Sequence, residues 1–469
     1  MYKRKLKTRI LFLTFFLIVI LPLPVFAGRY VVSSTASSTN WSAASWTNYP
    51  SAFSGTACIP ATAMANAVAG DTVYFRGGQG GNYSVPGGYY EMPVWNPSRS
   101  GTAGNPITFT NYPNETPIII NTTQYSSDPI MGSNGYSYIT IDGFQFGTGA
   151  SNEGIAALRF QSANNWIVKN CVWKCVNLGS YNWGPNTQAI YSDGAAGGTM
   201  YNALIQNCLF TGGQSAIDQH FNFINIYFTN QLTIEYCTFE LGWGGVNLKN
   251  GGVDFTVRYN FFRNIQDYGY GSLKLGGQGG PWSNVNIYQN VFIQAAGTNA
   301  AICPWGSGSG LHIYNNTIYG VASGMYADSE SPTITNLDIY NNVAQTPTYT
   351  AVFQTRTTLA YMDYNIFYGA QSWTYQGSNS ASLAAWKARG WDTHSYYENP
   401  VFANAGGSLP SNYKISAAHK NSGRGGAYSS VIGAYITGNE QIGYVNPSGS
   451  PPPPPPDPPP SPPAGFRIQ

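Results

Sequence analysis

A short pattern of alternating apolar and polar residues recurs along most of the chain. It is clearest at 165–173, Asn-Trp-Ile-Val-Lys-Asn-Cys-Val-Trp, and at 255–262, Phe-Thr-Val-Arg-Tyr-Asn-Phe-Phe. Apolar residues at every second position are typical of a β-strand with one buried face. The pattern therefore predicts a series of short strands separated by turns. Further copies lie at 203–210, 232–239, 285–292, 311–318 and 337–343, with weaker ones at 71–75, 106–110 and 138–146.

A column of Asn and Cys residues fixes the period of these strands. A strand ends at one of these residues in each unit, and successive members are 37, 29, 23, 30, 26, 26 and 23 residues apart. Such spacings suit one coil of a β-solenoid, in which each coil buries too little alone and must stack on its neighbours. Stacked asparagines can also pass amide hydrogen bonds between coils, and Asn tolerates the left-handed backbone of a bend. The column is Cys171, Cys208, Cys237, Asn260, Asn290, Asn316, Asn342 and Asn365.

These features predict an all-β fold, a right-handed, single-stranded parallel β-helix. A left-handed hexapeptide helix is disfavoured because the chain has no six-residue period. A helical array is excluded, since β-branched and aromatic residues recur at period two between Gly and Asn turns. A β-sandwich or a propeller stays open as an alternative.

Both ends of the chain differ from the repeats. Residues 1–27 hold five basic residues, an apolar run at 10–20 and Val-Phe-Ala at 25–27, which predicts a secretory signal peptide cleaved after Ala27. Proline dominates 451–463 and predicts a stiff linker or tail. We therefore expect an N-terminal cap at 28–64, a β-helix at 65–445 and a Pro-rich tail at 446–469, in a monomer that is secreted or periplasmic and not membrane-spanning.

The charge of the mature chain argues against a nucleic-acid partner. Without the five basic residues of the first segment, 17 basic and 20 acidic residues remain, a net charge of −3. Nucleic-acid binding needs basic patches, which this balance does not favour. The six cysteines allow disulfides in an exported protein, but Cys171, Cys208 and Cys237 share the column, so we favour a stack of small buried side chains.

Three further segments carry a family resemblance. They are 70–76 (Gly-Asp-Thr-Val-Tyr-Phe-Arg), 104–109 (Gly-Asn-Pro-Ile-Thr-Phe) and 399–402 (Asn-Pro-Val-Phe). With the repeats, they make residues 65 to 436 resemble the pectate-lyase-like right-handed β-helix superfamily. That superfamily includes lyases, hydrolases, esterases, epimerases and phage adhesins, so the resemblance implies the fold and a carbohydrate partner more than one reaction.

The polysaccharide lyases that include chondroitinase B and alginate lyases give the most similar functional pattern. In them a lysine on one strand is followed, one coil later, by an arginine on the next. Lys249 matches the lysine of this pattern. Gly276 stands where the arginine would be, and Lys274 lies two residues earlier. The resemblance therefore implies Lys249 and Lys274 as catalytic residues of a lyase for a uronic-acid polymer.

Aligned second strands of the coils place the remaining candidates on one outward face. One predicted ladder joins Arg159, Tyr191, Asp218, Asn247 and Lys274, and the other joins Gln161, Asp193, His220, Lys249, Gly276 and Trp305. Such a face suits an extended polysaccharide. We expect Arg159, Tyr191, Asn247 and Trp305 to bind substrate.

β-Elimination requires a base, an acid and a group that stabilises negative charge. Lys249 is the expected base, with Lys274 close to it, and His220 or Tyr191 the expected acid. Asp193 and Asp218 are candidate ligands for Ca²⁺, which prefers oxygen donors; no organic cofactor is expected. Two alternatives remain open: a glycoside hydrolase that uses Asp193 and Asp218 as its carboxylate pair, and a non-catalytic glycan-binding or adhesin-like β-solenoid.

Overall fold

The structure is a computed structural model. It describes residues 27–78, 82–86, 92–123, 129–150, 153–175, 188–193, 200–213, 221–249, 251–266, 271–276, 280–293, 300–321, 324–327, 332–346, 348–354 and 356–447. The predicted signal peptide, except Ala27, and the proline run at 451–463 lie outside these residues.

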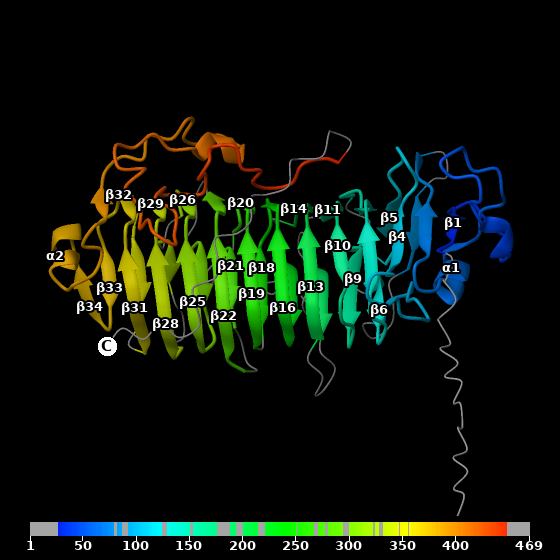
Figure 1. The fold of residues 1–469 in the computed structure, drawn as a ribbon, viewed down its shortest axis with the longest axis horizontal. Coiled ribbons are helices and arrows are strands. Elements are labelled where there is room, and N and C mark those ends of the chain that lie inside the picture. Colours follow the sequence, from blue (N-terminus) through cyan, green and yellow to red (C-terminus); the bar gives the residue numbers. More distant parts are fainter. Residues whose placement is uncertain are drawn as a thin grey trace, which may run out of the picture.

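Three long sheets, which we call A, B and C, run the length of the molecule (Figure 1). Strands from successive coils pair in parallel with their neighbours, as in the register Ile167 with Leu204 and Leu204 with Thr233. One antiparallel pair, β33 with β34, lies at the C-terminal end of sheet C. The described residues therefore form the parallel β-helix that the repeat predicts.

The strands of sheet A, in spatial order, are β1 (Arg29–Val32), β2 (Thr72–Phe75), β4 (Ile107–Asn111), β7 (Ile139–Asp142), β10 (Ile167–Lys169), β13 (Met200–Gln206), β16 (Thr229–Glu235), β19 (Gly252–Arg258), β22 (Trp282–Tyr288), β25 (Gly308–Tyr314), β28 (Ile334–Tyr340) and β31 (Thr357–Asp363). Those of sheet B are β3 (Tyr83–Val85), β5 (Ile118–Asn121), β8 (Gln145–Phe146), β11 (Val172–Cys175), β14 (Leu209–Gly212), β17 (Thr238–Glu240), β20 (Phe261–Arg263), β23 (Val291–Ile293), β26 (Thr317–Tyr319), β29 (Val343–Thr346), β32 (Ile366–Gly369) and β35 (Tyr396–Tyr397). Those of sheet C are β6 (Pro129–Asn134), β9 (Ala157–Gln161), β12 (Gln188–Asp193), β15 (Asn222–Tyr227), β18 (Val246–Lys249), β21 (Leu273–Leu275), β24 (Ile302–Pro304), β27 (Tyr326–Ala327), β30 (Ala351–Phe353), β33 (Trp373–Tyr375) and β34 (Ser378–Ser380). The helices are α1 (Pro60–Asn66) and α2 (Leu383–Lys387), with 3-10 turns at Ser42–Ala44 and Pro410–Tyr413.

The core consists of side chains that stack from coil to coil. Inside sheet B, the rings of Trp173 and Phe210 lie 4.7 Å apart, and those of Phe210 and Phe239 lie 4.9 Å apart, each pair nearly parallel. Parallel strands lie about 4.8 Å apart, so equivalent rings meet face to face at the spacing of the sheet. The aromatic residues two positions after the first five column residues therefore form one continuous stack, which Phe262 and Phe292 extend.

The Asn column lies at the corner between sheets A and B and is fully buried. Asn316 Nδ2 donates to the carbonyl oxygens of Ile287 (2.9 Å) and Tyr314 (3.1 Å) and to Oδ1 of Asn342 (3.1 Å). Each backbone N–H in this part of the column donates to the amide oxygen one coil further on, as Asn290 N does to Asn316 Oδ1 (3.0 Å). The buried corner thus has its polar groups paired without water.

The cysteines of the column repeat part of this hydrogen-bond pattern. Cys208 Sγ donates to the carbonyl oxygens of Gln206 and Val168, the equivalents of the two carbonyls that Asn316 reaches. All six cysteines of the chain lie within the described residues as buried free thiols. Burial raises the pKa of the Cys171 and Cys208 thiols well above the ordinary value. The column cysteines are therefore small inward-facing side chains, as the sequence favoured.

The left-handed backbone conformation of the bend occurs at the residue immediately before each column residue. We expected it at the column residue itself. Tyr259, Gln289 and Asn315 have φ values of 57°, 52° and 52°. The column residue points inward and cannot also form the bend, so its neighbour adopts the strained conformation. Several coils place Asn there, the non-Gly residue for which this geometry costs least.

Residues 398–447, which we call the strap, return along the outer face of sheet B (orange to red in Figure 1). Ala434 N donates to Thr317 Oγ1 (3.0 Å), and Tyr444 N donates to Thr238 Oγ1 (2.9 Å). Residues that immediately precede a column residue also bind the strap. For example, Asn315 Nδ2 donates to Val431 O (2.6 Å). The strap covers an apolar row that includes Val291, Val343 and Ile366 and so completes the burial of sheet B.

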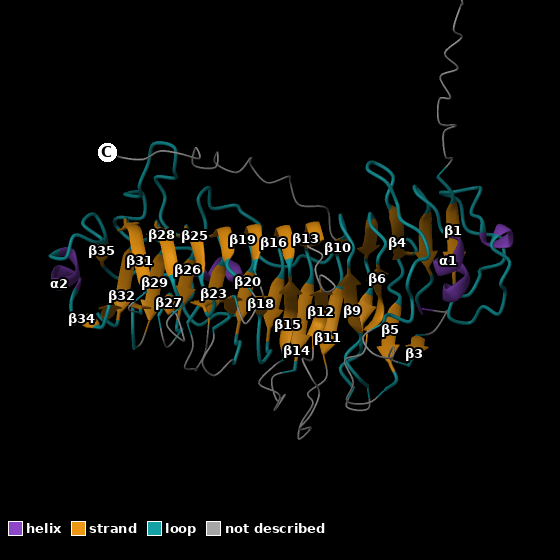
Figure 2. Ribbon diagram, turned by 90° about the horizontal axis from the view of Figure 1, so that it is seen from below, coloured by secondary structure: helices purple, strands orange, loops and turns teal. Residues whose placement is uncertain are grey.

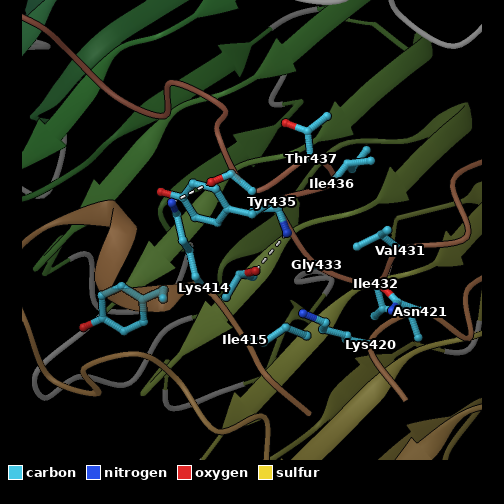
Figure 3. Close-up of a pocket in the computed structure, with 14 residues that line it drawn as sticks. Lys414, Ile415, Lys420, Asn421, Val431, Ile432, Gly433, Tyr435, Ile436 and Thr437 are labelled. Carbon is cyan, nitrogen blue, oxygen red and sulfur yellow. Dashed lines mark hydrogen bonds between the residues drawn. The ribbon is translucent and has the colours of Figure 1, made fainter. Parts of the chain in front are cut away.

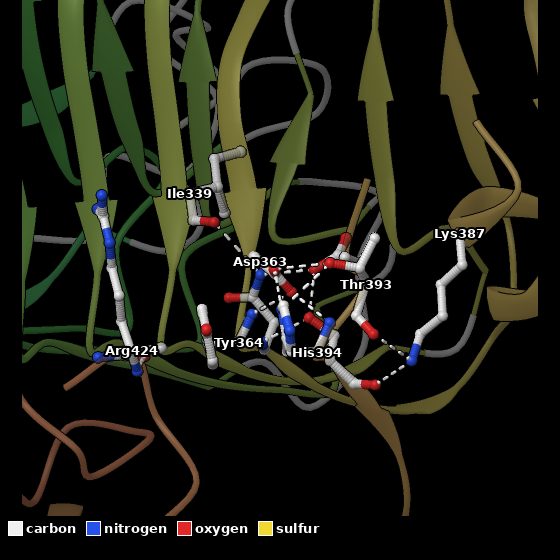
Figure 4. A network of polar contacts seen from close by, with 11 residues as sticks. Ile339, Asp363, Tyr364, Lys387, Thr393, His394 and Arg424 are labelled. Carbon is white, nitrogen blue, oxygen red and sulfur yellow. Dashed lines mark hydrogen bonds and ion pairs between the residues drawn. The ribbon is translucent and has the colours of Figure 1, made fainter. Parts of the chain in front are cut away.

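The C-terminal end of the Asn column meets a buried carboxyl group. Asp392 Oδ1 accepts hydrogen bonds from Asn365 Nδ2 (2.9 Å) and the Ser395 hydroxyl (2.5 Å), and Oδ2 accepts one from Trp386 Nε1 (2.8 Å). The adjacent polar contacts of Asp363, Thr393 and His394 are drawn in Figure 4. Burial raises the pKa of Asp392 from 3.8 to about 6, although its three donors act in the opposite direction.

This carboxyl group should make stability depend on pH. Because its pKa is higher in the folded chain, its contribution is fully present below pH 3.8 and is lost as the pH rises through about 6. The two-unit difference corresponds to about 3 kcal/mol of unfolding free energy. Urea unfolding between pH 4 and 7 should show this decline, and it should be absent in Asp392→Asn; an identical slope in both proteins would contradict the assignment.

Candidate functional site

The outer face of sheet C carries a row of polar residues, one from each of five adjacent strands. Register pairs Arg159 with Tyr191, Tyr191 with Asn225, Asn225 with Asn247 and Asn247 with Lys274. Their neighbours along each strand, such as Leu158 and Phe160, belong to the apolar core, so alternation turns this first row outward. Figure 2 shows four of these strands, β9, β12, β15 and β18, side by side.

Four of the five residues in the first row are buried although they lie outside the core, and Tyr191 is half-buried. Arg159 is 3% exposed, Asn225 1%, Asn247 5% and Lys274 4%. Buried charged and amide groups cost free energy unless they are paired or take part in a function. The first row therefore places two cations and two amides beneath the outer surface of sheet C, and one of the cations, Arg159, is paired with Asp193.

Two residues of the first row have a side-chain amide oxygen with no hydrogen-bond partner among the residues that the structure describes. The two oxygens are Oδ1 of Asn225 and Oδ1 of Asn247, on adjacent strands. Nδ2 of Asn225 lies 3.5 Å from the Tyr227 hydroxyl. Each unpaired oxygen is an acceptor that a water molecule or a ligand hydroxyl can satisfy.

A second row lies beside the first and is half-exposed. It contains Gln161, Asp193, Tyr227 and Lys249, because Asp193 is paired with Gln161 and Lys249 with Tyr227. Lys249 Nζ lies 5.2 Å from the centre of the Tyr227 ring, and this ring lies 5.4 Å from that of Tyr191. The half-exposed amino group of Lys249 therefore lies over the phenol ring of Tyr227, and this ring in turn contacts Tyr191 on the preceding coil.

Arg159 and Asp193 join the two rows at the N-terminal side. Arg159 Nη2 lies 3.3 Å from Asp193 Oδ2, and the guanidinium group lies 5.0 Å from the centre of the Tyr191 ring. The Tyr191 hydroxyl also donates to Asp193 Oδ2, at 3.4 Å. These contacts fix Tyr191 between a cation and a carboxylate.

The structure thus brings together several of the residues selected from the sequence. Arg159, Tyr191, Asn247 and Lys274 share the first row, and Asp193 and Lys249 share the second. Trp305 follows β24, and its backbone N donates to Leu275 O (2.7 Å), which places it two coils from Lys249. Asp218 and His220 lie outside the described residues.

The strand register corrects one predicted position in each of the two ladders. The strand paired between β12 and β18 is β15 (Asn222–Tyr227), so Asn225 and Tyr227 occupy the positions that the sequence alignment assigned to Asp218 and His220. Sequence analysis missed these two residues. The signal that could have found them is the alternation Ile224-Asn225-Ile226-Tyr227, in which both isoleucines enter the core.

Of the two predicted calcium ligands, Asp193 lies among the described residues and Asp218 does not, so the calcium site stays a prediction. Ca²⁺ takes six to eight oxygen ligands. No cluster of three or more Asp, Glu, His or Cys side chains suited to a metal occurs within the described residues, and the Asp193 carboxylate is already paired with Arg159. We therefore assign no reaction step to calcium.

Comparison with known proteins supports the architecture. Residues 181–318 match the family model for the right-handed beta helix region. Pectate lyase Pel9A is 14% identical over 87% of this chain and 96% of its own, with a TM-score of 0.51, a likeness that shows the fold alone. No curated protein matches this chain.

Two other solved structures are more distant. A PL6 family polysaccharide lyase, Pedsa3628 from Pseudopedobacter saltans, is 13% identical over 80% of this chain and 97% of its own, with a TM-score of 0.44. PfbA, a surface adhesin of Streptococcus pneumoniae, is 14% identical over 65% and 82%, with a TM-score of 0.34. No helix among the described residues is long and apolar enough to cross a membrane. The chain is a right-handed parallel β-helix with the pectate-lyase-like fold.

Proposed function

We propose that this protein acts outside the cell on a uronic-acid polysaccharide, which it binds along the outer face of sheet C and cleaves by β-elimination. The observation that carries the proposal is the half-exposed Lys249 over the ring of Tyr227, which in turn contacts Tyr191, next to a row of buried polar residues. The half-exposed second row runs across consecutive strands, so it can contact an extended polymer at several successive positions.

Lys249 is the better candidate for the base. β-Elimination removes the proton next to the sugar carboxylate and breaks the bond to the leaving oxygen on the adjacent carbon. A base must reach that proton, and Lys249 is half-exposed whereas Lys274 is 4% exposed. Lys274 therefore supports the site from the first row, where its charge favours a nearby carboxylate.

The hydroxyl of Tyr227, whose ring contacts Lys249, or that of Tyr191 on the preceding coil can supply the leaving-group proton. The Tyr227 ring contacts Lys249 directly, and the Tyr191 hydroxyl is held by Asp193. Tyr191 is the acid that the sequence suggested, with His220 as the other candidate. Arg159 and Asp193 would then orient Tyr191, since both contact it.

Absorbance of the product tests the proposal directly. β-Elimination leaves a double bond conjugated to the carboxylate, which absorbs ultraviolet light, whereas hydrolysis leaves only new reducing ends. The protein should produce this absorbance from pectate, alginate or a glycosaminoglycan, and the assay should be run with Ca²⁺ and with a chelator. New reducing ends without absorbance would favour the hydrolase, and binding without either product would favour a glycan-binding solenoid.

A further inference from the structure

A separate cavity lies between two limbs of the strap and the outer face of sheet B. Its volume is about 190 Å³, and it is lined by residues of 413–421 and of 431–438, with Thr317 of β26 as its third side (Figure 3). The candidate site on sheet C uses none of these residues. Ligand sites for drug-sized molecules usually exceed 300 Å³, so this cavity suits a smaller molecule, such as a single sugar unit.

Hydrogen bonds hold the cavity open. Ile432 N donates to Lys420 O (2.7 Å), which joins the two limbs. Lys414 Nζ donates to Gly438 O (2.6 Å) and so ties the same limbs at the other end of the cavity. Ala434 N donates to Thr317 Oγ1 (3.0 Å), which fixes the second limb on β26. A ligand would therefore enter a preformed site at little cost in ordering.

The ionisable side chains of the lining favour a negative ligand. Lys414 and Lys420 line the cavity, and no Asp or Glu belongs to the lining. Two acidic residues of the strap lie close to the lining in sequence or by contact and are already paired: Glu440 accepts from the backbone N–H groups of Thr437 and Gly438, and Glu398 pairs with His419. No hydrogen bond or ion pair of the Lys420 ammonium group occurs among the described residues, so it is available to bind an anion.

The rest of the lining is apolar or able to form hydrogen bonds. Ile415, Ile432 and Ile436 supply apolar surface, Tyr435 supplies a ring, and Asn421 supplies an amide. A pyranose with a carboxylate combines the matching features: an apolar C–H face, hydroxyl groups and one negative charge.

We propose that this cavity is an accessory binding site for one carboxylate-bearing sugar unit, such as a galacturonate or glucuronate monosaccharide. The proposal does not depend on catalysis at sheet C. Lys420 would bind the carboxylate, Lys414 would add positive potential, and the isoleucines would contact the sugar ring. A site of this kind would hold a uronate chain end or a released monosaccharide against the strap.

Titration calorimetry of the intact protein with monosaccharides tests the proposal. Galacturonate or glucuronate should bind at least tenfold more tightly than glucose, which lacks the carboxylate, and than acetate, which lacks the ring. Lys420→Gln should weaken uronate binding at least tenfold, because one charge-assisted hydrogen bond is lost. Lys174→Gln, which removes an exposed lysine from β11, is the matched control and should bind as the wild type does.

Three outcomes would overturn the proposal. They are equal binding of uronate and glucose, equal binding of uronate and acetate, and unchanged uronate binding in Lys420→Gln. Lys249→Ala separates the two sites, because loss of monosaccharide binding in that variant would place the ligand on sheet C instead. Thermal unfolding of Lys420→Gln should match the wild type, since only its backbone is used to join the limbs.

Discussion

Replacing Lys249 with alanine should lower the formation of unsaturated product at least about a hundredfold, the range expected when a general base is removed. Polymer binding should change much less, because Lys249 is one of several polar groups along the two rows. The fold should also persist, since the side chain is half-exposed and its contact with the Tyr227 ring contributes about 1 kcal/mol at most. The measurements are initial absorbance rates and polymer affinity on the same preparation.

Two further variants make this result specific. Lys174→Ala removes an exposed lysine from sheet B and should keep the wild-type rate. Tyr227→Phe keeps the ring beside Lys249 and removes only the hydroxyl, so a lower rate with unchanged binding would identify Tyr227 as the acid. A Lys249→Ala protein that still forms unsaturated product at the wild-type rate would exclude Lys249 as the base.

The fold could be predicted from the sequence because its determinants recur in successive coils. Trp173, Phe210 and Phe239 follow their column residues by two positions, and each stacks on the next at the strand spacing. The column residues lie at the same corner in each coil whatever the length of the loops, so they show how successive coils align. Local alternation and a period of 23 to 37 residues therefore suffice to specify one chain path.

The site was predicted less completely, because register on sheet C depends on connections that vary in length. The longest column spacing, 37 residues from Cys171 to Cys208, immediately precedes the coil in which the alignment chose Asp218 instead of Asn225. No column residue marks the strands of sheet C, so a shift of a few residues changes every outward side chain. Arg159, Tyr191 and Lys249 were identified because their own strands alternate clearly between apolar and polar residues.

The strap was not foreseen, because its contacts join residues far apart in the sequence. Asn315 binds Val431, 116 residues later, and Asn207 binds Val445, 238 residues later. These bonds use backbone groups of the strap, which leave no pattern of side chains to recognise. The paired asparagines at 315 and 316 instead have separate roles, since the first binds the strap and the second builds the column.

Asn316→Ala should lower the free energy of unfolding by about 4 kcal/mol. The change removes the donors to Ile287 O, Tyr314 O and Asn342 Oδ1 and the acceptor of Asn290 N. Asn316 is fully buried, so water cannot replace these partners, and each unpaired buried group costs about 1 to 3 kcal/mol. Urea unfolding measures the loss, and Asn439→Ala, at an exposed position of the strap, is the control.

Asn316→Cys distinguishes lost hydrogen bonds from lost volume. Cys208 and Cys237 occupy the same column and donate through Sγ to the carbonyl groups equivalent to those that Asn316 reaches. A cysteine at 316 should therefore recover part of the loss seen with alanine, although sulfur is a weaker donor and acceptor. If the alanine variant is as stable as Asn439→Ala, the column contributes little to stability. If cysteine is no better than alanine, the thiols of the first coils fill space at the corner without replacing the amide bonds.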